Sequence, residues 1–570
     1  MHEQTQAQIP EKSQAHPGHP ALIQIFQQSM RDNFALECLT DYNTGETITY
    51  AEFARRIARL HILFGKTGIH KGDRVALLGK NNINWVVAFM ATVTYGATIV
   101  PILNEFNPND CQHIINHSGS TLLFVCDHIW ESIDFDELKD VTAALSLDTG
   151  KVLAEHNSNG AVAKHVKGLS RSFRAKYPRG YNPADIVYAT VDDDALAILN
   201  YTSGTTGFSK GVMLTQRSLW GNLVFGIDSK LHFRGSRVLS FLPLAHAYGC
   251  AFDLLVPLAV GSHITLLGRT PTPKILIKAF ADVKPSLIIT VPLILEKIYK
   301  KMIVPALNNV KMRMALSIPM MDRFIYPRIR NRLIKAFGGE FTEVIVGGAA
   351  LNPEVEQFLH KIKFPFTVGY GMTECGPLIS YTPWRQFIPG STGRTLPGLM
   401  EARILSDSPG EPGEILVRGT NVMAGYYRKP DLTEDTIEED GWLHTGDVGT
   451  LGGPDGQTIF IRGRCKTMIL TANGQNIYPE EIEAKLNNMP YVAESLVVER
   501  DGKLVALVFP DSELTDRDGI DDVQMRPIME ANRVALNKLV APYEQVAHIQ
   551  LVPSEFEKTP KRSIKRFLYS

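Results

Sequence analysis

The segment between residues 344 and 368 constrains the fold more than any other part of the sequence. Val344-Ile345-Val346 and Phe366-Thr367-Val368 are short apolar runs of the kind that form strands. Asn352 followed by Pro353 is typical of the start of a helix. Apolar residues then recur at helical spacing, at Val355, Phe358, Leu359 and Ile362. A strand, a helix and a strand in this order predict a βαβ unit with parallel strands and a right-handed crossover.

The rest of the sequence repeats this alternation of short strands and helices, which favours a layered α/β architecture. Arg74–Leu78 and Leu122–Val125 are two further expected strands. From residue 465 the pattern changes to α+β, with helices expected at 479–487 and 525–539 and strands at 495–498, 504–509 and 547–552. Because 570 residues exceed what one hydrophobic core can support, we expect several parts. These are a flexible tail (1–20), a large layered α/β N-terminal domain (21–464) and a smaller, mobile α+β C-terminal domain (465–570).

Composition and charge exclude several classes of protein. Lys and Arg number 59 against 60 Asp and Glu, so the chain lacks the overall positive field of a nonspecific nucleic-acid binder. The six cysteines are scattered without a CxxC pair, which argues against a disulfide scaffold or zinc module and fits a reducing compartment. The uncharged run from Trp85 to Leu103 turns β-rich at Thr98, so we interpret it as a buried helix and a strand rather than a membrane span. Since the N-terminus lacks a signal-peptide pattern, we expect a cytoplasmic protein.

The most informative stretch for function runs from Tyr201 to Gly211. Its three glycines let backbone N–H groups point toward an anion, its five Ser and Thr hydroxyls add donors, and Lys210 adds charge. The glycine spacing differs from that of a Walker loop, and Gly65-Lys66-Thr67 lacks the preceding glycine that such a loop needs. Apolar runs at 196–199 and 212–214 flank the stretch, so we expect a phosphate-binding loop that joins two strands. An ordinary Ser/Thr/Gly turn is the alternative.

This loop resembles the signature of the adenylate-forming (AMP-binding) superfamily, which includes acyl-CoA synthetases, nonribosomal adenylation domains and luciferases. It departs from that family at Ser209, where proline is usual. Other stretches resemble further family motifs in the same order: Pro243–Gly249 (substrate lining), Gly347–Ala349 and Gly369–Glu374 (adenine and magnesium), Gly441–Asp447 (ribose), Arg464–Lys466 (hinge) and Lys558–Arg566 (C-terminal lysine). The resemblance covers nearly the whole chain and implies ATP, Mg²⁺ and CoA as cofactors.

The resemblance also implies a role for each matching residue of the adenylation domain. Lys210 would hold the β- and γ-phosphates together with the loop residues Thr202, Ser203, Gly204, Thr205, Thr206 and Gly207. Glu374 would bind Mg²⁺, and Thr373 would donate to the α-phosphate. Adenine would contact Gly348, Ala349, Tyr370 and Gly371, and the ribose would contact Asp447 and Arg464. The alternatives are that Glu374 has a purely structural role and that Asp447 is an ordinary surface residue.

Three further residues are expected to serve the acceptor step. By resemblance, His246 lies where the carboxylate and the thiol approach, and we expect it to position them; a buried structural histidine is the alternative. Lys466 is expected to be the hinge about which the C-terminal domain moves between the two half-reactions. The loop that ends at Asn476 is then expected to face CoA in the second state.

The C-terminal lysine motif departs from the family pattern. Related enzymes carry a lysine three residues before an arginine, where it bridges the substrate carboxylate and the α-phosphate. Here the residue three positions before Arg566 is Ser563, whose neutral hydroxyl cannot replace a flexible cation. Lys561 or Lys565 is expected to substitute, with Lys565 slightly preferred. Impaired adenylation is the alternative.

The substrate class follows from a finer resemblance. Val346–Pro353 and Ala315–Gly339 look most like bacterial long-chain fatty acyl-CoA synthetases, which predicts ATP-dependent activation of a medium- or long-chain fatty acid and its transfer to CoA. An acyl-carrier-protein ligase and a luciferase-like oxygenase remain alternatives. The pattern GxSxG at Gly207–Gly211 also matches the nucleophile motif of serine hydrolases, but that motif needs a helix after the serine.

The expected partners are a carboxylic acid and CoA, with no nucleic acid. Basic and apolar residues alternate between Arg323 and Phe337, which is compatible with a basic amphipathic helix in peripheral contact with the inner face of a membrane, or with a solvated helix face. A homodimer is left open.

Overall fold

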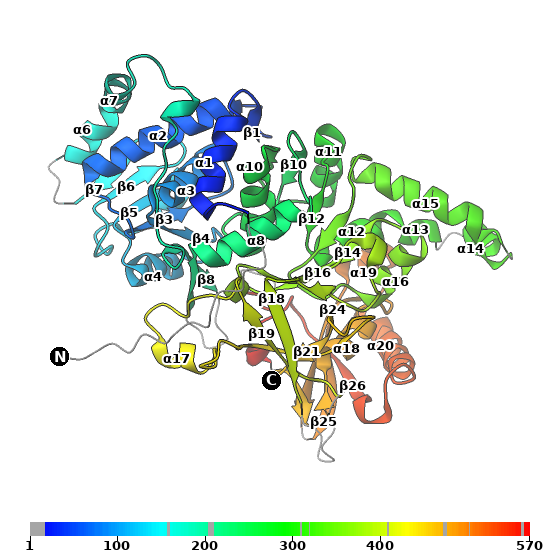
Figure 1. Cartoon of the computed structure of the whole chain (residues 1–570). Coiled ribbons are helices and arrows are strands. Elements are labelled where there is room, and N and C mark those ends of the chain that lie inside the picture. Colours follow the sequence, from blue (N-terminus) through cyan, green and yellow to red (C-terminus); the bar gives the residue numbers. More distant parts are fainter. Residues whose placement is uncertain are drawn as a thin grey trace.

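A computed structural model of the chain describes residues 18–156, 160–202, 210–307, 310–318, 320–406, 408, 410–470, 476–500, 502–559 and 564–569. Within these residues the protein has a large mixed α/β part and a smaller C-terminal part, drawn in orange and red in Figure 1. This confirms the predicted fold class. The predicted tail lies almost wholly outside the described residues.

The first sheet has seven strands in the order β7-β6-β5-β3-β4-β8-β9. Its strands are β3 (Arg74–Leu78), β4 (Thr98–Ile102), β5 (Leu122–Val125), β6 (Ala143–Ser146), β7 (Val152–Glu155), β8 (Leu196–Thr202) and β9 (Lys210–Thr215). The pairs are parallel except at the two edges, where β6–β7 and β8–β9 are antiparallel. The predicted strands at 74–78 and 122–125 are confirmed, and the uncharged run forms α3 (Ile83–Tyr95) followed by β4.

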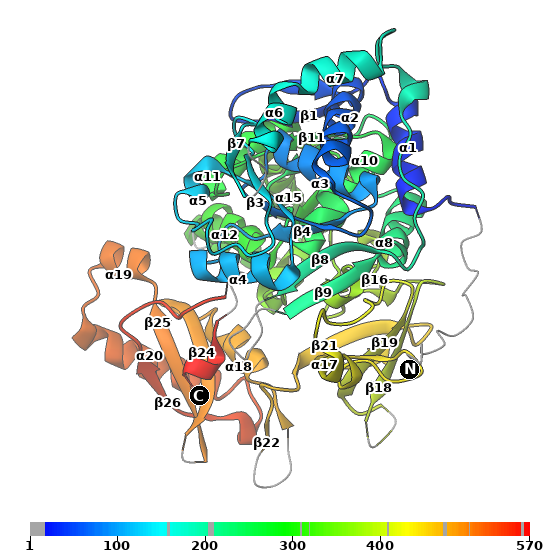
Figure 2. The ribbon, with the colours of Figure 1, turned by 90° about the vertical axis from the view of Figure 1, so that its left-hand side faces the viewer.

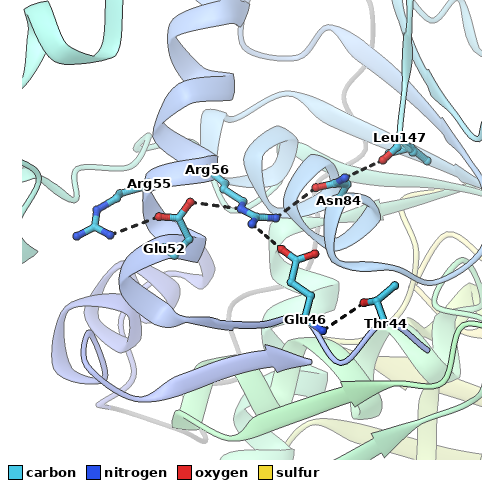
Figure 3. A network of polar contacts seen from close by, with 7 residues as sticks. All are labelled: Thr44, Glu46, Glu52, Arg55, Arg56, Asn84 and Leu147. Carbon is cyan, nitrogen blue, oxygen red and sulfur yellow. Dashed lines mark hydrogen bonds and ion pairs between the residues drawn. The ribbon is translucent and has the colours of Figure 1, made fainter. Parts of the chain in front are cut away.

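The helices of this region are α1 (Leu22–Asp32), α2 (Tyr50–Thr67), α3, α4 (Pro108–Ser118), α5 (Asp127–Trp130), α6 (Ala161–Lys167), α7 (Leu169–Lys176) and the 3₁₀ turn η1 (Pro183–Asp185). Figure 3 shows a charged network that fixes the start of α2. There Arg56 bonds Glu46 at 2.7 Å and Glu52 at 3.4 Å, and Asn84 of α3 donates to the Leu147 carbonyl at 2.8 Å. These contacts join α2, α3 and the end of β6 into one framework.

Two smaller sheets follow, and the first of them contains the predicted βαβ unit. It has the order β12-β13-β14, where β12 is Ile288–Thr290, β13 is Val344–Val346 and β14 is Phe366–Val368. β13 and β14 are parallel, and α16 (Pro353–Lys361) connects them. The Asn352 side chain accepts from the N–H groups of Glu354 and Val355, so the predicted helix start is confirmed.

The second small sheet has the order β10-β11-β1-β2, with β1 (Glu37–Asp41), β2 (Thr47–Thr49), β10 (Arg237–Ser240) and β11 (His263–Leu266). The helices of this part of the sequence are α8 (Gln216–Asp228), α9 (Ala247–Gly249), α10 (Val256–Val260), α11 (Pro273–Val283), α12 (Pro292–Met302), α13 (Val304–Leu307), α14 (Val310–Ser317) and α15 (Asp322–Ala336).

Between α9 and α10 the chain forms a π-helix, η2 (Cys250–Leu255), which the sequence analysis did not predict. The N–H of Val256 donates to Ala251, five residues back. The next residue, Pro257, has no N–H, so the following carbonyl, that of Phe252, cannot be paired in the same register. The buried His232 donates to it instead through Nε2 at 3.1 Å. Burial lowers the pKa of His232 to about 4, so the ring is neutral.

A seven-stranded sheet in the order β15-β16-β17-β21-β20-β19-β18 forms the yellow region of Figure 2, and its neighbouring strands pair antiparallel where their register is given. Its strands are β15 (Tyr370–Gly371), β16 (Leu378–Tyr381), β17 (Arg394–Thr395), β18 (Met400–Leu405), β19 (Gly413–Gly419), β20 (Leu443–Gly452) and β21 (Thr458–Arg464). The short elements η3 (Thr373–Cys375), η4 (Trp384–Gln386) and α17 (Pro430–Glu434) lie between these strands in the sequence.

The C-terminal part contains β22 (Ile469–Leu470), β23 (Asn476–Ile477), α18 (Pro479–Leu486), β24 (Val492–Arg500), β25 (Lys503–Pro510), α19 (Ser512–Asp518), α20 (Asp522–Leu536), η5 (Pro542–Glu544), β26 (Val546–Leu551) and η6 (Arg566–Leu568). β24, β25 and β26 form its three-stranded sheet. All the elements predicted here are present, with ends shifted by up to three residues. Its buried apolar residues form clusters separate from the large core of the preceding part.

A pair of asparagines joins the two parts. The Asn352 side chain donates to Asn488 Oδ1 at 2.6 Å, and Asn488 donates back to Asn352 Oδ1 at 3.1 Å. Asn352 caps α16, and Asn488 lies just beyond the end of α18. We call this reciprocal contact the asparagine clasp.

The helix α15 is amphipathic, as the sequence predicts. Its apolar side is covered by the protein, because Ile325, Ile329 and Leu333 are all buried in the main core. A membrane could therefore reach α15 only from its exposed side, and the predicted peripheral membrane contact stays a prediction. Within the described part of the chain, none of the helices combines the length and the apolar character that crossing a bilayer requires. The six cysteines are free thiols.

Candidate functional site: a cluster of lysines between two carboxylates

The glycine-rich loop connects the two strands of a hairpin. β8 ends at Thr202 and β9 begins at Lys210, and these two residues face each other across the ladder. The prediction that the loop joins two strands is confirmed, and the helix that a serine-hydrolase elbow needs is replaced by β9. The loop residues Ser203, Gly204, Thr205, Thr206 and Gly207 lie outside the described residues. Thr202 is buried at the base of the loop.

A distant segment lies along β9 and brings an unforeseen residue to Lys210. The N–H of Met213 donates to the Gly425 carbonyl at 3.0 Å, and the N–H of Tyr427 donates to the Gly211 carbonyl at 2.8 Å. This pairing places the ring of Tyr426 under Lys210, whose Nζ lies 5.0 Å from the ring centroid. The sequence analysis missed Tyr426, since nothing in its local sequence indicates a strand-edge contact with β9.

Tyr426 also links the lysine to the predicted magnesium ligand. Its hydroxyl donates to Glu374 Oε1 at 2.9 Å. Tyr426 is buried and Glu374 is half-buried, so the bond is shielded from solvent on one side. Burial, and then the Glu374 charge, raise the pKa of Tyr426, so its hydroxyl remains a donor.

The charges of two other lysines act on Lys210. Burial lowers the pKa of Lys210, the charges of Lys466 and Lys429 lower it further, and Glu374 opposes them. Like charges repel one another, and a bound polyanion would relieve that repulsion. The donor set therefore fits a polyphosphate. The carboxylate of Glu374 beside the lysines is a hard oxygen ligand of the kind that Mg²⁺ prefers.

Two buried amides hold the turn that carries Thr373 and Glu374. Asn222 of α8 donates to the Cys375 carbonyl at 3.1 Å and accepts from the N–H of Leu378 at 2.8 Å. Asn421 donates to the Leu378 carbonyl at 2.8 Å. Thr373 itself is buried. Neither asparagine was recognised from sequence, because each acts on backbone groups of elements that are remote in the chain.

A second carboxylate centre forms around Asp447. Tyr370 donates its hydroxyl to Asp447 Oδ2 at 2.7 Å, and Arg464 Nε lies 3.1 Å from Asp447 Oδ1. The sheet dictates this meeting, since Asp447 and Arg464 are directly opposite in the β20–β21 register. Burial raises the pKa of Asp447, while Arg464 and Tyr370 oppose the rise. Each carboxylate oxygen retains acceptor capacity for a further hydroxyl, which fits a ribose.

The glycines of the adenine motif make room for a close neighbour. A Cβ at Gly347 would lie 3.1 Å from the ring of Tyr248, whose hydroxyl donates to the Ile345 carbonyl at 3.1 Å. Gly348 has φ +86°, which disfavours any side chain there, and Ala349 after it is exposed. A Cβ at Gly371 would collide with the Pro377 carbonyl. At Gly347 and Gly371 the protein's own neighbouring groups therefore occupy the space that a Cβ would need, so close packing requires glycine at both positions.

The segment that carries His246 is attached to the strand before the phosphate loop. Asn200 of β8 donates to the Ala245 carbonyl at 2.9 Å. His246 is half-buried and starts α9, and Tyr248 two residues later contacts Gly347. The structure thus connects the predicted acyl segment to both the phosphate loop and the adenine motif.

The predicted hinge region lies between the Asp447 centre and the C-terminal part. Lys466 is exposed and its charge reaches Lys210. The N–H of Cys465 donates to the Gly446 carbonyl at 2.9 Å, and the Thr467 hydroxyl donates to Glu480 at 2.7 Å. Asn476 is exposed at the start of β23, whereas residues 473–475 lie outside the described residues.

The predicted C-terminal lysine is held within its own part of the protein. Lys565 Nζ lies 3.3 Å from Glu557 Oε2, and its N–H donates to the Glu557 carbonyl at 2.8 Å. Among the described residues, no contact joins Lys565 to Lys210 or Glu374. Lys561 and Ser563 lie outside the described residues. Arg566 pairs with the buried Glu483 and, at 3.5 Å, with Glu480.

This arrangement of lysine and carboxylates fits a nucleoside polyphosphate. Comparisons with known proteins show the family. A family model described as AMP-binding enzyme matches residues 10–427, and one described as AMP-binding enzyme C-terminal domain matches residues 466–569. The long-chain-fatty-acid–CoA ligase of Escherichia coli O157:H7 is 29% identical over 507 residues, which cover 84% of this chain and 83% of that protein. The 4-coumarate–CoA ligase 5 of Oryza sativa subsp. japonica is 30% identical over 505 residues, which cover 85% of this chain and 83% of that protein.

The fold is also that of solved structures. ATP-bound MatB from Rhodopseudomonas palustris matches with a TM-score of 0.72 at 23% identity, covering 96% of this chain and 98% of that one. The chain therefore belongs to the AMP-binding enzyme family and is an adenylate-forming acid–CoA ligase. The predicted cofactors ATP, Mg²⁺ and CoA are those of this class.

Proposed function

We propose that the chain activates a medium- or long-chain fatty acid with ATP and transfers the acyl group to CoA. The observation that carries the proposal is the contact from Lys210 to the ring of Tyr426 and from the Tyr426 hydroxyl to Glu374, which sets a cation and a carboxylate side by side at the end of the phosphate-loop hairpin. The fatty-acid assignment is supported by the similarity to long-chain-fatty-acid–CoA ligases. The comparable similarity to a 4-coumarate–CoA ligase makes an aromatic acid the competing substrate class.

In the first half-reaction, a carboxylate oxygen of the acid attacks the α-phosphorus of ATP, and pyrophosphate leaves. Lys210 and the loop from Thr202 to Gly207 bind the β- and γ-phosphates and neutralise the charge of the leaving group. Thr373 donates to the α-phosphate. Asp447 and Arg464 orient the ribose, and Tyr370, Gly371, Gly348 and Ala349 surround the adenine. Mg²⁺, when bound at Glu374, supplies further charge neutralisation on the phosphates.

In the second half-reaction, the CoA thiol attacks the acyl carbonyl, and AMP leaves. His246 positions the carboxylate and the thiol. Residues 21–464 act as the adenylation domain, and residues 465–570 rotate about Lys466 so that Asn476 faces the CoA side. Lys565 replaces the family lysine in the adenylating orientation, which requires it to leave Glu557. This exposed pair is inexpensive to break, since surface ion pairs contribute about 0–1 kcal/mol.

A pyrophosphate-release assay over a panel of acids tests the substrate class. Hexadecanoic, octanoic, 4-coumaric and malonic acids are compared, each with and without CoA. The proposal predicts the highest kcat/KM for one of the two fatty acids and AMP and acyl-CoA as products. Preference for 4-coumarate or malonate would refute the fatty-acid assignment.

The acceptor alternatives give different products in the same assay. Acyl transfer only when an acyl-carrier protein replaces CoA would indicate a carrier-protein ligase. Oxygen uptake or light emission with ATP and acid would indicate a luciferase-like oxygenase.

We propose a cytoplasmic location for the chain, while the homodimer stays a prediction.

A further inference from the structure

The helices α14 and α15 project from the large part of the protein at the right of Figure 1. Four apolar side chains at the turn between them are exposed. Met314 is 63% exposed, Ile318 55%, Met320 62% and Phe324 62%. We call these four residues the apolar tip. Single exposed apolar residues are common on protein surfaces, but a group on one projecting turn marks an interaction site.

Exposed cations continue from the apolar tip along α15. Arg328, Arg332 and Lys335 follow Phe324 at spacings of four, eight and eleven residues, so they lie on one side of the helix. We call these three residues the basic stripe. All three are exposed, and within the described part of the chain no ion pair involves them. They are therefore available to a partner.

The charge of this region is strongly positive. Residues 297–335 contain ten lysines and arginines and one acidic residue, Asp322, whereas the whole chain has a net charge of −1. Asp322 is half-buried and its charge acts on Lys361. The region therefore presents a local positive field on a protein that is otherwise acidic, and such a field selects an anionic partner.

We propose that the apolar tip and the basic stripe dock the protein on an anionic lipid bilayer. Phe324 and the neighbouring Met and Ile side chains enter the boundary between headgroups and acyl chains, while Arg328, Arg332 and Lys335 contact the lipid phosphates. An anionic bilayer matches both features, because its surface is negative and apolar groups lie only a few ångströms beneath it. The apolar side of α15 stays packed on the protein core throughout.

This docking is separate from the adenylation chemistry, although it complements a fatty-acid substrate that partitions into bilayers. The test of docking measures binding without turnover. Docking can therefore be refuted while the proposed function holds, and the proposed function can be refuted while docking holds. The full chain is sedimented with vesicles of phosphatidylcholine alone and with vesicles that also contain phosphatidylglycerol. The proposal predicts binding only to the second kind, weakening as the salt concentration is raised because the interaction is screened.

Two variants and two matched controls localise the binding. Arg328→Gln with Arg332→Gln should weaken partitioning by about 25-fold, from about fivefold for each cation near an anionic surface. Phe324→Ser should weaken it roughly threefold or more by removing an inserted ring. Arg385→Gln with Arg526→Gln, and Phe233→Ser, change exposed residues of the same types outside basic segments and should bind like the wild type.

Four results would overturn the proposal. The first is failure of the wild type to sediment with phosphatidylglycerol vesicles at low salt, which would assign the surface to a protein partner. The second is equal binding to both vesicle types. The third is retention of wild-type binding by the variants of the basic stripe and the apolar tip. The fourth is an equal loss in the matched controls.

Discussion

Replacing Tyr426 with phenylalanine tests how the site holds Glu374. The hydroxyl of Tyr426 donates to Glu374 Oε1 at 2.9 Å, and its ring lies under Lys210. Tyr426→Phe removes the hydroxyl and keeps the ring, so the packing and the Lys210 contact should survive. We expect Glu374 to lose its fixed orientation, which should slow adenylation and raise the Mg²⁺ concentration that gives the half-maximal rate.

The size of the effect follows from the type of bond. A hydrogen bond to a charged group contributes about 1.5–3 kcal/mol. Glu374 is only half-buried, so solvent can replace part of the lost bond, and the lower end of the range applies. At about 1.4 kcal/mol per decade in rate, the adenylation rate should fall by about tenfold. The melting temperature should change little, because the ring still fills its buried space.

The assay is single-turnover pyrophosphate release over a Mg²⁺ titration. Tyr427→Phe is the matched control, since Tyr427 is the adjacent tyrosine and among the described residues its hydroxyl has no hydrogen bond. Tyr426→Leu should be slower than Tyr426→Phe, because it also removes the ring beneath Lys210. An adenylation rate and a Mg²⁺ dependence in Tyr426→Phe that match the wild type would refute the reasoning.

Three further predictions concern pH, the domain contact and the C-terminal lysine. Burial disfavours a charged His444, but its bonds to Glu414 (2.9 Å) and Glu438 (3.1 Å) outweigh burial and raise the pKa of His444. The stabilisation by His444 is therefore full below about pH 6.5 and is lost as pH rises through the pKa of the folded state. The melting temperature of the wild type should fall relative to that of His444→Gln between about pH 6 and pH 9, and parallel curves would contradict this. Lys466→Pro, which fixes φ at the predicted hinge, should slow thioester formation more than adenylation. Asn488→Ala, which opens the asparagine clasp, should change the two half-reaction rates by factors about two- to tenfold apart. Equal factors for the two half-reactions would count against a domain rotation. Lys565→Ala should slow single-turnover adenylation more than Lys561→Ala, whereas full activity in both together with a faster Ser563→Lys would show that no neighbouring lysine substitutes.

Local signals predicted much of the fold. The βαβ unit was predictable because Asn352, Pro353 and the apolar stripe after them lie within one helix and two strands that are consecutive in sequence. The hairpin around the phosphate loop was predictable for the same reason, since β8 and β9 directly flank it. The π-helix η2 was not predicted, because it depends on a carbonyl orphaned by Pro257 and on a histidine from a different segment.

The candidate site was predictable only where a motif carries the residue. Asp447 and Arg464 were named from motifs, but their pairing depends on the register of β20 and β21. Tyr426, Asn222 and Asn421 were missed, because each reaches the site through a long-range backbone contact that leaves no local pattern. The spacing of apolar residues correctly predicted that α15 is amphipathic. The same spacing does not determine whether protein or lipid covers the apolar side.

The central claim is that the lysine cluster around Lys210 binds ATP for attack by a carboxylic acid. Acid-dependent exchange of labelled pyrophosphate into ATP, in the absence of CoA, tests this most directly when wild type and Lys210→Ala are compared at equal folded concentration. The account predicts exchange in the wild type and a loss of about 10²–10³-fold in Lys210→Ala, with unchanged circular dichroism and melting temperature. Exchange by Lys210→Ala at the wild-type rate would contradict it.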